Sequence, residues 1–266
     1  MYAPTHQATQ ARAYRAETGQ LGEWNSKIDI GFAVGQAIDF ERPRPGRRHG
    51  ARMIGTDPVQ VKVGFSAKPL FSRVQPPLIL ASTSVYRREL LSRLRLPFEA
   101  LPPKVAETHL SGEPQVDRAL RLAHEKARAI AQQRPDALVI GADQVAAAGD
   151  QSLDKPGDAE RCRAQLRLLS GGTARFHTAC VVLGVHAGVR LAHVDTTTVF
   201  VRALNDAEIE RYVVSERPFD CAGGFKVEGS GIALFERIES QDPTALIGLP
   251  LIWLAGALRA AGLPVP

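Results

Sequence analysis

The sequence predicts an α/β protein with a mixed sheet, because short apolar runs typical of buried strands alternate with segments of helical periodicity. Residues 78–81 (LILA) and 137–145 (ALVIGADQV) are apolar enough to be buried strands. Residues 175–186 and 189–202 resemble two paired strands joined around Gly188, and such a pair makes the sheet mixed rather than wholly parallel.

Each predicted helix has a recognisable start or stop signal. Ser84 and Asn205 have side-chain oxygens that can accept a free backbone N–H of a first helical turn. Pro114 suits a helix start, and Gly171-Gly172 suits a helix end. Residues 98–104 should be extended and 221–238 should form glycine-rich turns. The predicted helices span residues 86–94, 114–133, 158–169, 205–216 and 243–261.

The first 77 residues differ from the remainder of the chain and are expected to be a mostly disordered extension. They hold 11 Lys and Arg against 6 Asp and Glu, whereas residues 78–266 hold 22 of each. Only residues 59–65 alternate like a strand, without an obvious partner. The Pro/Arg tract at 42–48 could contact nucleic acid or lipid, be a solvated tail, or be translated sequence upstream of a true start.

The composition is that of a globular domain and excludes several classes of function. The balanced charge of residues 78–266 gives no basic field of the kind that binds nucleic acid. No apolar run approaches the ~20 residues that cross a bilayer, so no membrane association is expected. The three cysteines have no metal-type spacing, which suits free thiols in a cytoplasmic protein.

A phosphate-binding turn is predicted between the first strand and the first helix. Ser82 and Ser84 offer hydroxyls, and the first helical turn offers free backbone N–H groups. Arg87 and Arg88 follow in that turn, where cations oppose the helix dipole unless an anion is bound. The alternative is a surface helix with solvated arginines.

Two carboxylates could handle a metal ion or a water molecule. Asp143 follows the apolar run LVIGA, and open α/β sheets bind ligands at the ends of such strands. It could act as a general base or bind a divalent cation, or it could simply cap a turn. Glu107 lies in a polar break and could be a second ligand or a surface residue.

Two lysines could add positive charge to the same site. Lys126 lies near the apolar face of its helix, where a lysine either extends its ammonium to the surface or has a function. Lys155 precedes Pro156 in a turn, which would fix its direction, although turn lysines are normally solvated. Together with the two serines, Arg87 and the two acids, these lysines form a set of side chains suited to hydrolysis of a polyphosphate.

Seven segments of residues 78–266, taken in order, resemble the Maf family of nucleotide pyrophosphatases. They are LILASTSVYRRELL, EKARA, VIGADQV, LDKP, LLSGGTARFHT, and FDCAGGFKVEGSGIALFERI followed by LIGLPL. The resemblance implies an elongated α/β fold of the Maf/ITPase kind, with two lobes around a central cleft. It also implies hydrolysis of the α–β phosphoanhydride bond of a nucleoside triphosphate with a divalent cation, Mg²⁺ or Mn²⁺. A homodimer is the implied assembly.

The resemblance also assigns expected roles to the candidate residues. Asp143 matches the proton acceptor and, with Glu107, is expected to bind the metal. The expected substrate phosphate ligands are Ser82, Ser84, Arg87, Lys126 and Lys155. Tyr86, Gln144 and Glu228 match the specificity positions of the 7-methyl-GTP pyrophosphatase branch. Val85 and Ala106 depart from the family pattern, in which a proline and an acid are usual.

These roles leave three functions open. The first is hydrolysis of 7-methyl-GTP to 7-methyl-GMP and diphosphate. The second is a broader pyrophosphatase activity on triphosphates such as dTTP and UTP. The third is nucleotide binding without turnover by a regulator of septum formation.

Overall fold

The structure, a computed structural model, describes residues 75–266, and the elements below are those of this part of the chain. The strands are β1 (Leu78–Ala81), β2 (Glu99–Leu101), β3 (Leu138–Ala148), β4 (Gln151–Ser152), β5 (Thr173–Gly184), β6 (Val189–Val201) and β7 (Phe235–Glu239). The α-helices are α1 (Val85–Ser92), α2 (Gln115–Ala131), α3 (Ala159–Leu169), α4 (Asp206–Glu216) and α5 (Leu251–Ala260). Three short 3₁₀ helices are η1 (Ala222–Gly224), η2 (Ser230–Leu234) and η3 (Ala245–Ile247).

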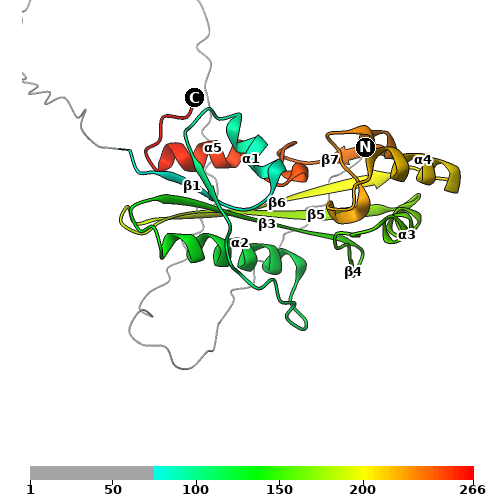
Figure 1. The fold of residues 1–266 in the computed structure, drawn as a ribbon, viewed down its shortest axis with the longest axis horizontal. Helices are drawn as coiled ribbons and strands as arrows, with labels where there is room; N and C mark the ends of the chain where they lie inside the picture. Colours follow the sequence, from blue (N-terminus) through cyan, green and yellow to red (C-terminus); the bar gives the residue numbers. More distant parts are fainter. Residues whose placement is uncertain (1–74) are drawn as a thin grey trace, which may run out of the picture. The chain divides into compact units, whose positions relative to one another are not determined.

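The strands of residues 75–266 form one seven-stranded mixed sheet in the order β2-β1-β3-β5-β6-β7, with β4 paired to the end of β3 (Figure 1). β1 runs parallel to β2 and to β3, and the other pairings are antiparallel. The predicted α/β class and the mixed sheet are therefore confirmed. The disorder predicted for residues 1–77 concerns a segment that, up to residue 74, lies outside the described residues, as does the strand-like alternation at 59–65.

The predicted helix caps are present. The Ser84 hydroxyl accepts a hydrogen bond from the backbone N–H of Arg87, at 3.3 Å, and α1 begins at the next residue. Asn205 and Glu208 form a reciprocal capping box at the start of α4. Both helices therefore begin within one residue of the position that the sequence indicates.

The helix predicted over residues 243–261 is wrong in its first half. Gly248 has a φ of +129°, which side-chain-bearing residues rarely adopt, and it ends η3. Pro250 then precedes α5 and supplies no N–H to a continuing helix. The segment is consequently split into η3 and α5, and the intervening turn faces the site described below.

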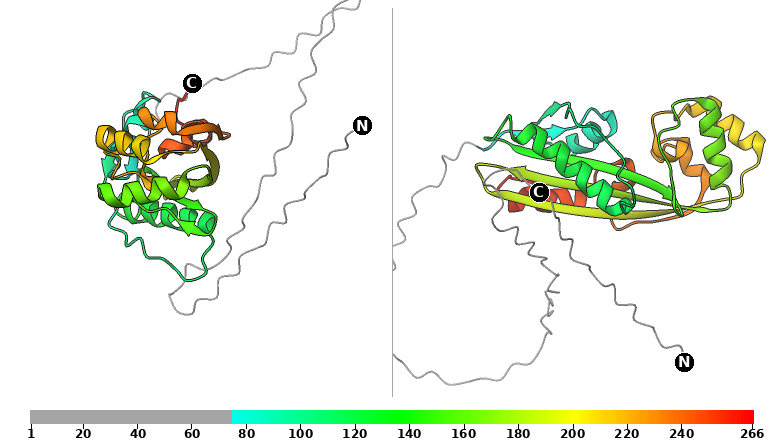
Figure 2. Two further views of the ribbon diagram at one scale, coloured as in Figure 1. Left: turned by 90° about the vertical axis from the view of Figure 1, so that its right-hand side faces the viewer. Right: turned by 90° about the horizontal axis from the view of Figure 1, so that it is seen from below.

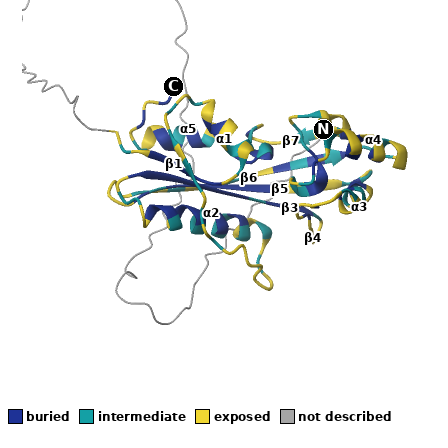
Figure 3. Ribbon diagram, viewed as in Figure 1, coloured by how far each residue is buried: buried dark blue, intermediate teal, exposed yellow. Residues whose placement is uncertain are grey.

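Alternate side chains of the central strands belong to two different cores. Leu138 and Ile140 pack with α1 and α5 on one face of the sheet, and Val139 packs with α2 on the other. Figure 1 shows α2 on one side of the sheet and α1 and α5 on the opposite side. Figure 3 shows the sheet buried between them, with the outer helix surfaces exposed.

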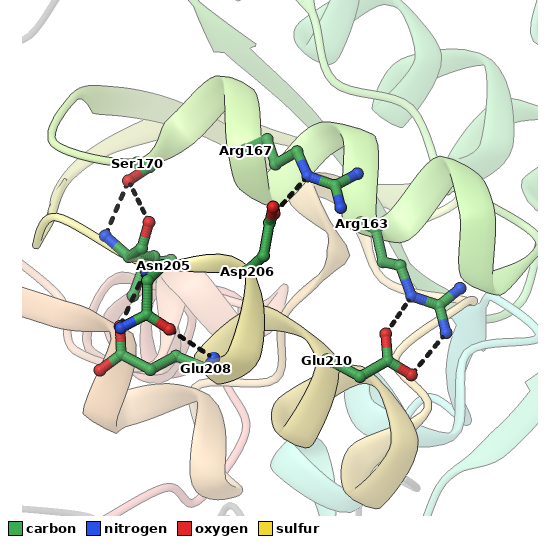
Figure 4. A network of polar contacts seen from close by, with 8 residues as sticks. Arg163, Arg167, Ser170, Asn205, Asp206, Glu208 and Glu210 are labelled. Carbon is green, nitrogen blue, oxygen red and sulfur yellow. Dashed lines mark hydrogen bonds and ion pairs between the residues drawn. The ribbon is translucent and has the colours of Figure 1, made fainter.

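A third core lies at the far end of β3, β5 and β6. Its helices α3 and α4 group with η1 and η2 away from α1, α2 and α5 (Figure 2). Arg163 pairs with Glu210, and Arg167 pairs with Asp206 at 2.6 Å, so exposed ion pairs join α3 to α4 (Figure 4). The three long strands thus carry two lobes, which confirms the predicted architecture of residues 78–266.

Within residues 75–266, no helix is both long enough and apolar enough to cross a bilayer.

Candidate active site

A cleft of about 360 Å³ lies where the cores of the two lobes meet. β1 ends at Ala81, opposite Gly141, whereas β3 continues to Ala148. Between Gly141 and Ala147, where β4 pairs, the β1-facing edge of β3 has no neighbouring strand, and the turn that leads from β1 into α1 lines the cleft there. The sequence placed Asp143 at the end of a strand; it lies instead within β3, just past the end of the parallel pairing.

The cleft brings together the ten residues that the sequence singled out. They are Ser82, Ser84, Tyr86, Arg87, Glu107, Lys126, Asp143, Gln144, Lys155 and Glu228. The sequence alone left most of them, Asp143, Glu107 and the two lysines among them, with an alternative as a surface, capping or solvated residue. Their gathering in one cleft favours the functional alternative.

A charged cluster of Lys126, Asp143 and Glu107 lies in the cleft. The Lys126 ammonium lies 2.6 Å from Asp143 Oδ1 and 2.5 Å from Glu107 Oε1. The side chains of Lys126 and Asp143 are only 9% and 8% exposed, whereas that of Glu107 is 56% exposed. Lys126 therefore does not extend its ammonium into solvent, and that alternative is wrong.

Gly141 explains how Lys126 reaches Asp143. Both Gly141 and Asp143 point toward α2, because they are two residues apart on one strand. A Cβ at Gly141 would collide with the Ala123 carbonyl and lie 2.7 Å from the Ala127 Cβ. The absence of a side chain thus lets α2 pack closely on β3, and Lys126, the residue before Ala127, is brought to the carboxylate.

The Glu107 carboxyl group is kept ionised by its surroundings. Its partial burial acts to raise its pKa, but the hydrogen bond and charge of Lys126 act in the opposite direction. Lys155 and Arg87 add smaller contributions of the same sign as Lys126, and the net pKa lies below its usual value. Glu107 is consequently an anion near neutral pH.

The turn before α1 has the features predicted for phosphate binding. Ser82 is buried, and its hydroxyl accepts a hydrogen bond from the Ser84 N–H at 3.1 Å. Ser84 caps the helix, so its hydroxyl oxygen is already engaged as an acceptor. The remaining donors at this point are backbone N–H groups of the first turn and hydroxyl protons.

Arg87 and Lys155 contribute cations from opposite lobes. The Arg87 Nε donates to the Gly248 carbonyl at 2.9 Å, which leaves its two terminal nitrogens without a hydrogen bond to any described residue. Lys155 is exposed at the edge of the cleft. Its loop is fixed by the Gly157 N–H, which donates to the Phe219 carbonyl at 2.9 Å. Both cations can therefore contact an anion that enters the cleft.

Gln144 points to the face of the sheet opposite Asp143. Its amide nitrogen lies within hydrogen-bond distance of Thr178 Oγ1 and of the Ala245 and Leu246 carbonyls, at 2.9, 3.1 and 3.0 Å. These contacts hold η3, and with it the Gly248 turn, against the sheet. The amide oxygen of Gln144 accepts no hydrogen bond from the described residues. Gln144 thus supports the cleft wall and keeps one acceptor for a ligand.

The side of the cleft that carries Tyr86 also includes residues that the sequence did not single out as site residues. Asp220 and Cys221 line the cleft beside Tyr86, and Phe225 lines it with Val227. The Tyr86 hydroxyl donates to Asp220 Oδ2 at 3.2 Å. No local pattern predicts this contact, because the two residues are 134 positions apart.

The charges that line the cleft do not favour a polyphosphate by themselves. Three cations (Arg87, Lys126, Lys155) face four acids (Glu107, Asp143, Asp220, Glu228). Among the described residues, no three His, Cys, Asp or Glu side chains form a metal site. Two carboxylates are nevertheless what Mg²⁺ commonly takes from a protein when substrate phosphates supply further oxygens. Glu107 and Asp143 fit that pattern.

Residues 77–261 match the family model described as Maf-like protein. The chain belongs to the Maf family. A 7-methyl-GTP pyrophosphatase of Cupriavidus metallidurans is 53% identical over 73% of this chain and 97% of its own length. A protein of the same name from Xanthomonas oryzae pv. oryzae is 54% identical over 73% of this chain and 100% of its own length. A 7-methyl-GTP pyrophosphatase of Thiobacillus denitrificans is 53% identical over 73% of this chain and 96% of its own length.

The predicted Maf resemblance is thus confirmed, and the matched segment coincides with the α/β unit that contains the cleft. Among solved structures, a HAM1 protein from Coxiella burnetii aligns over 48% of this chain and 73% of its own, with 15% identity and a TM-score of 0.33. A likeness of that size adds nothing to the account of this fold.

Proposed function

We propose that this Maf protein hydrolyses 7-methyl-GTP to 7-methyl-GMP and diphosphate. The observation that carries the proposal is the buried Lys126–Asp143 pair, which fixes a carboxylate inside a cleft that also receives Arg87 and Lys155. The names of relatives that match this chain over almost their entire length support the choice of substrate.

In the proposed reaction, a water oxygen attacks the α-phosphorus while its proton passes to Asp143. One bond forms between the water oxygen and the α-phosphorus, and the bond between that phosphorus and the α–β bridging oxygen breaks. Diphosphate leaves with the electron pair. Lys126 occupies only Oδ1 of Asp143, so the other carboxylate oxygen can accept the proton.

The remaining cations stabilise the charge that develops during the reaction. The terminal nitrogens of Arg87 can form a bidentate contact with phosphate oxygens, and Lys155 can approach them from the other lobe. Glu107 and Asp143 would hold a Mg²⁺ or Mn²⁺ ion that offsets the charge of the triphosphate. The excess of acids over bases in the cleft supports a requirement for such a cation.

The other end of the cleft suits a positively charged base. Guanine methylated at N7 carries a positive charge, and an aromatic ring such as that of Tyr86 can stack on it with a cation–π contribution of about 0.5–2 kcal/mol. Glu228 is exposed at the cleft and can accept hydrogen bonds from the N1 and N2 edge of the base. Together these residues favour the methylated base over plain guanine.

The test is a substrate panel on the full-length chain. Diphosphate release is measured from 7-methyl-GTP, GTP, dTTP and UTP, with Mg²⁺, with Mn²⁺ and with a chelator. We expect the highest kcat/KM with 7-methyl-GTP and loss of turnover without a divalent cation. Asp143→Asn should lose about 10²–10⁴-fold in kcat, the usual size of general acid–base catalysis. The matched control is Asp150→Asn, an exposed residue beyond the end of β3 and outside the cleft, which should behave as wild type.

The outcomes separate the alternatives. Similar kcat/KM values for dTTP and UTP would indicate the broader pyrophosphatase, and binding without turnover would indicate the regulatory function. Near wild-type turnover of Asp143→Asn would refute the role of Asp143. The expected cytoplasmic location, the homodimer and the absence of nucleic-acid binding remain predictions.

A further inference from the structure

Tyr86 is held by contacts from the opposite lobe. It belongs to the first turn of α1, whereas Asp220 and Cys221 precede η1. The Tyr86 hydroxyl lies 3.2 Å from Asp220 Oδ2 and 3.8 Å from the Cys221 sulfur. The contact therefore spans the cleft and fixes the ring from the far wall.

The phenol of Tyr86 is a donor under all ordinary conditions. Burial raises its pKa most, and the neighbouring Cys221 and Asp220 raise it further. The hydroxyl consequently keeps its proton and donates it to the carboxylate. A hydrogen bond to an ionised acceptor is among the stronger ones, so Asp220 can restrict the ring's position.

Lys226 limits which face of the ring a base can use. Its ammonium lies 5.9 Å from the Tyr86 ring centroid and 3.9 Å from Asp220 Oδ1. Tyr86 and Asp220 line the cleft, but Lys226 does not. We therefore place Lys226 behind the ring, which leaves the other face for the base.

Two of the four cleft acids are separate from the charged cluster of Lys126. Asp220 and Glu228 come from the segment between α4 and η2, and neither pairs with Arg87, Lys126 or Lys155 among the described contacts. Asp220 is 58% exposed, so its charge is partly screened by water. Its main influence should therefore act through the Tyr86 hydroxyl rather than through space.

We propose that Asp220 is a positioning residue for base selectivity, which holds the Tyr86 ring across the cleft so that its free face stacks on a positively charged purine. This inference rests on the proposed function. A displaced ring would weaken the cation–π contribution, which a methylated guanine has and plain guanine lacks. The effect should thus appear as lost discrimination rather than as lost catalysis.

The experiment compares KM and kcat for 7-methyl-GTP and GTP in four variants of the full-length chain. Asp220→Ala and Tyr86→Phe each remove the hydrogen bond and should raise KM for 7-methyl-GTP by about three- to tenfold, with kcat within twofold of wild type. KM for GTP should change less than twofold. Asp220→Asn keeps an acceptor oxygen and should restore most of the discrimination. The double variant Asp220→Ala/Tyr86→Phe should lose no more than either single variant.

Each outcome bears on the proposal. If Asp220→Asn loses discrimination as Asp220→Ala does, the charge and not the hydrogen bond is responsible, and the positioning role is refuted. Additive losses in the double variant would also refute it, as would equal changes in KM for both nucleotides. Asp150→Ala is the control for removal of an exposed carboxylate. If the wild type itself shows no preference for 7-methyl-GTP, the proposed function fails; a preference that Asp220→Ala leaves intact overturns only this inference.

Discussion

The buried pair of Lys126 and Asp143 gives the sharpest test of the structure. Lys126→Met keeps a side chain of similar length on the same helix face but removes the ammonium. An uncompensated carboxylate would remain at Asp143, whose side chain is only 8% exposed. Removal of one partner from a buried ion pair typically destabilises a protein by about 3–5 kcal/mol. That loss is a large part of the ~5–15 kcal/mol by which folded domains are stable.

Urea unfolding at pH 7, followed by circular dichroism, measures this loss. We expect a lower midpoint with an unchanged slope, which indicates a change in stability alone. Lys126→Met/Asp143→Asn should recover part of the stability, because the double variant no longer buries an unpaired charge. Lys104→Met, at an exposed position, is the control. A loss below about 1 kcal/mol, as for a surface pair, would show that water reaches the pair and would refute its burial.

Three further predictions use other features of the described residues. Gly141→Ala should destabilise by at least the ~1–3 kcal/mol of an overpacked core and also lower kcat, because α2 must move away from β3; a wild-type urea midpoint would contradict this close packing. Glu107→Gln should lower stability by less than about 1 kcal/mol at pH 7, since the carboxylate is largely exposed. Because the folded-state pKa of Glu107 is depressed, that difference should be full above the ordinary carboxyl pKa and vanish as the pH falls through the folded-state pKa; a difference that does not change with pH would argue against the Lys126 contact. Burial raises the pKa values of the Cys162, Cys180 and Cys221 thiols to about 11, 12 and 12, so all three should react far more slowly with Ellman's reagent in the native protein than in urea; a rapid native phase would indicate that one of them is solvated.

Local patterns were sufficient for most of the fold. The strands at 78–81 and 137–145 are apolar runs, and the caps at Ser84 and Asn205 act within three residues of themselves. Their signals are short-range, so they can be read along the chain. The break at Gly248 does not follow from the sequence, because a single glycine two residues before Pro250 permits a turn without requiring one.

The arrangement of the site residues depends on contacts between segments that are far apart in the sequence, and no local pattern predicts such contacts. The helical period places Lys126 near the apolar face of α2. Only the packing of α2 on Gly141 shows that the Asp143 carboxylate lies next to its ammonium. Asp220 is exposed and lies in a turn-rich segment, so nothing in its neighbourhood marks it. Its relation to Tyr86 arises only when α1 and the η1 segment meet across the cleft.

The three long strands have a mechanical consequence for access to the cleft. Three strands, β3, β5 and β6, run without interruption from one lobe to the other, and the hydrogen bonds between them make this part of the sheet stiff. Rotation of one lobe against the other would have to bend these strands. Nucleotides should therefore enter and leave through movement of the exposed segment that carries Glu107, while amide protons of the three strands exchange slowly with solvent.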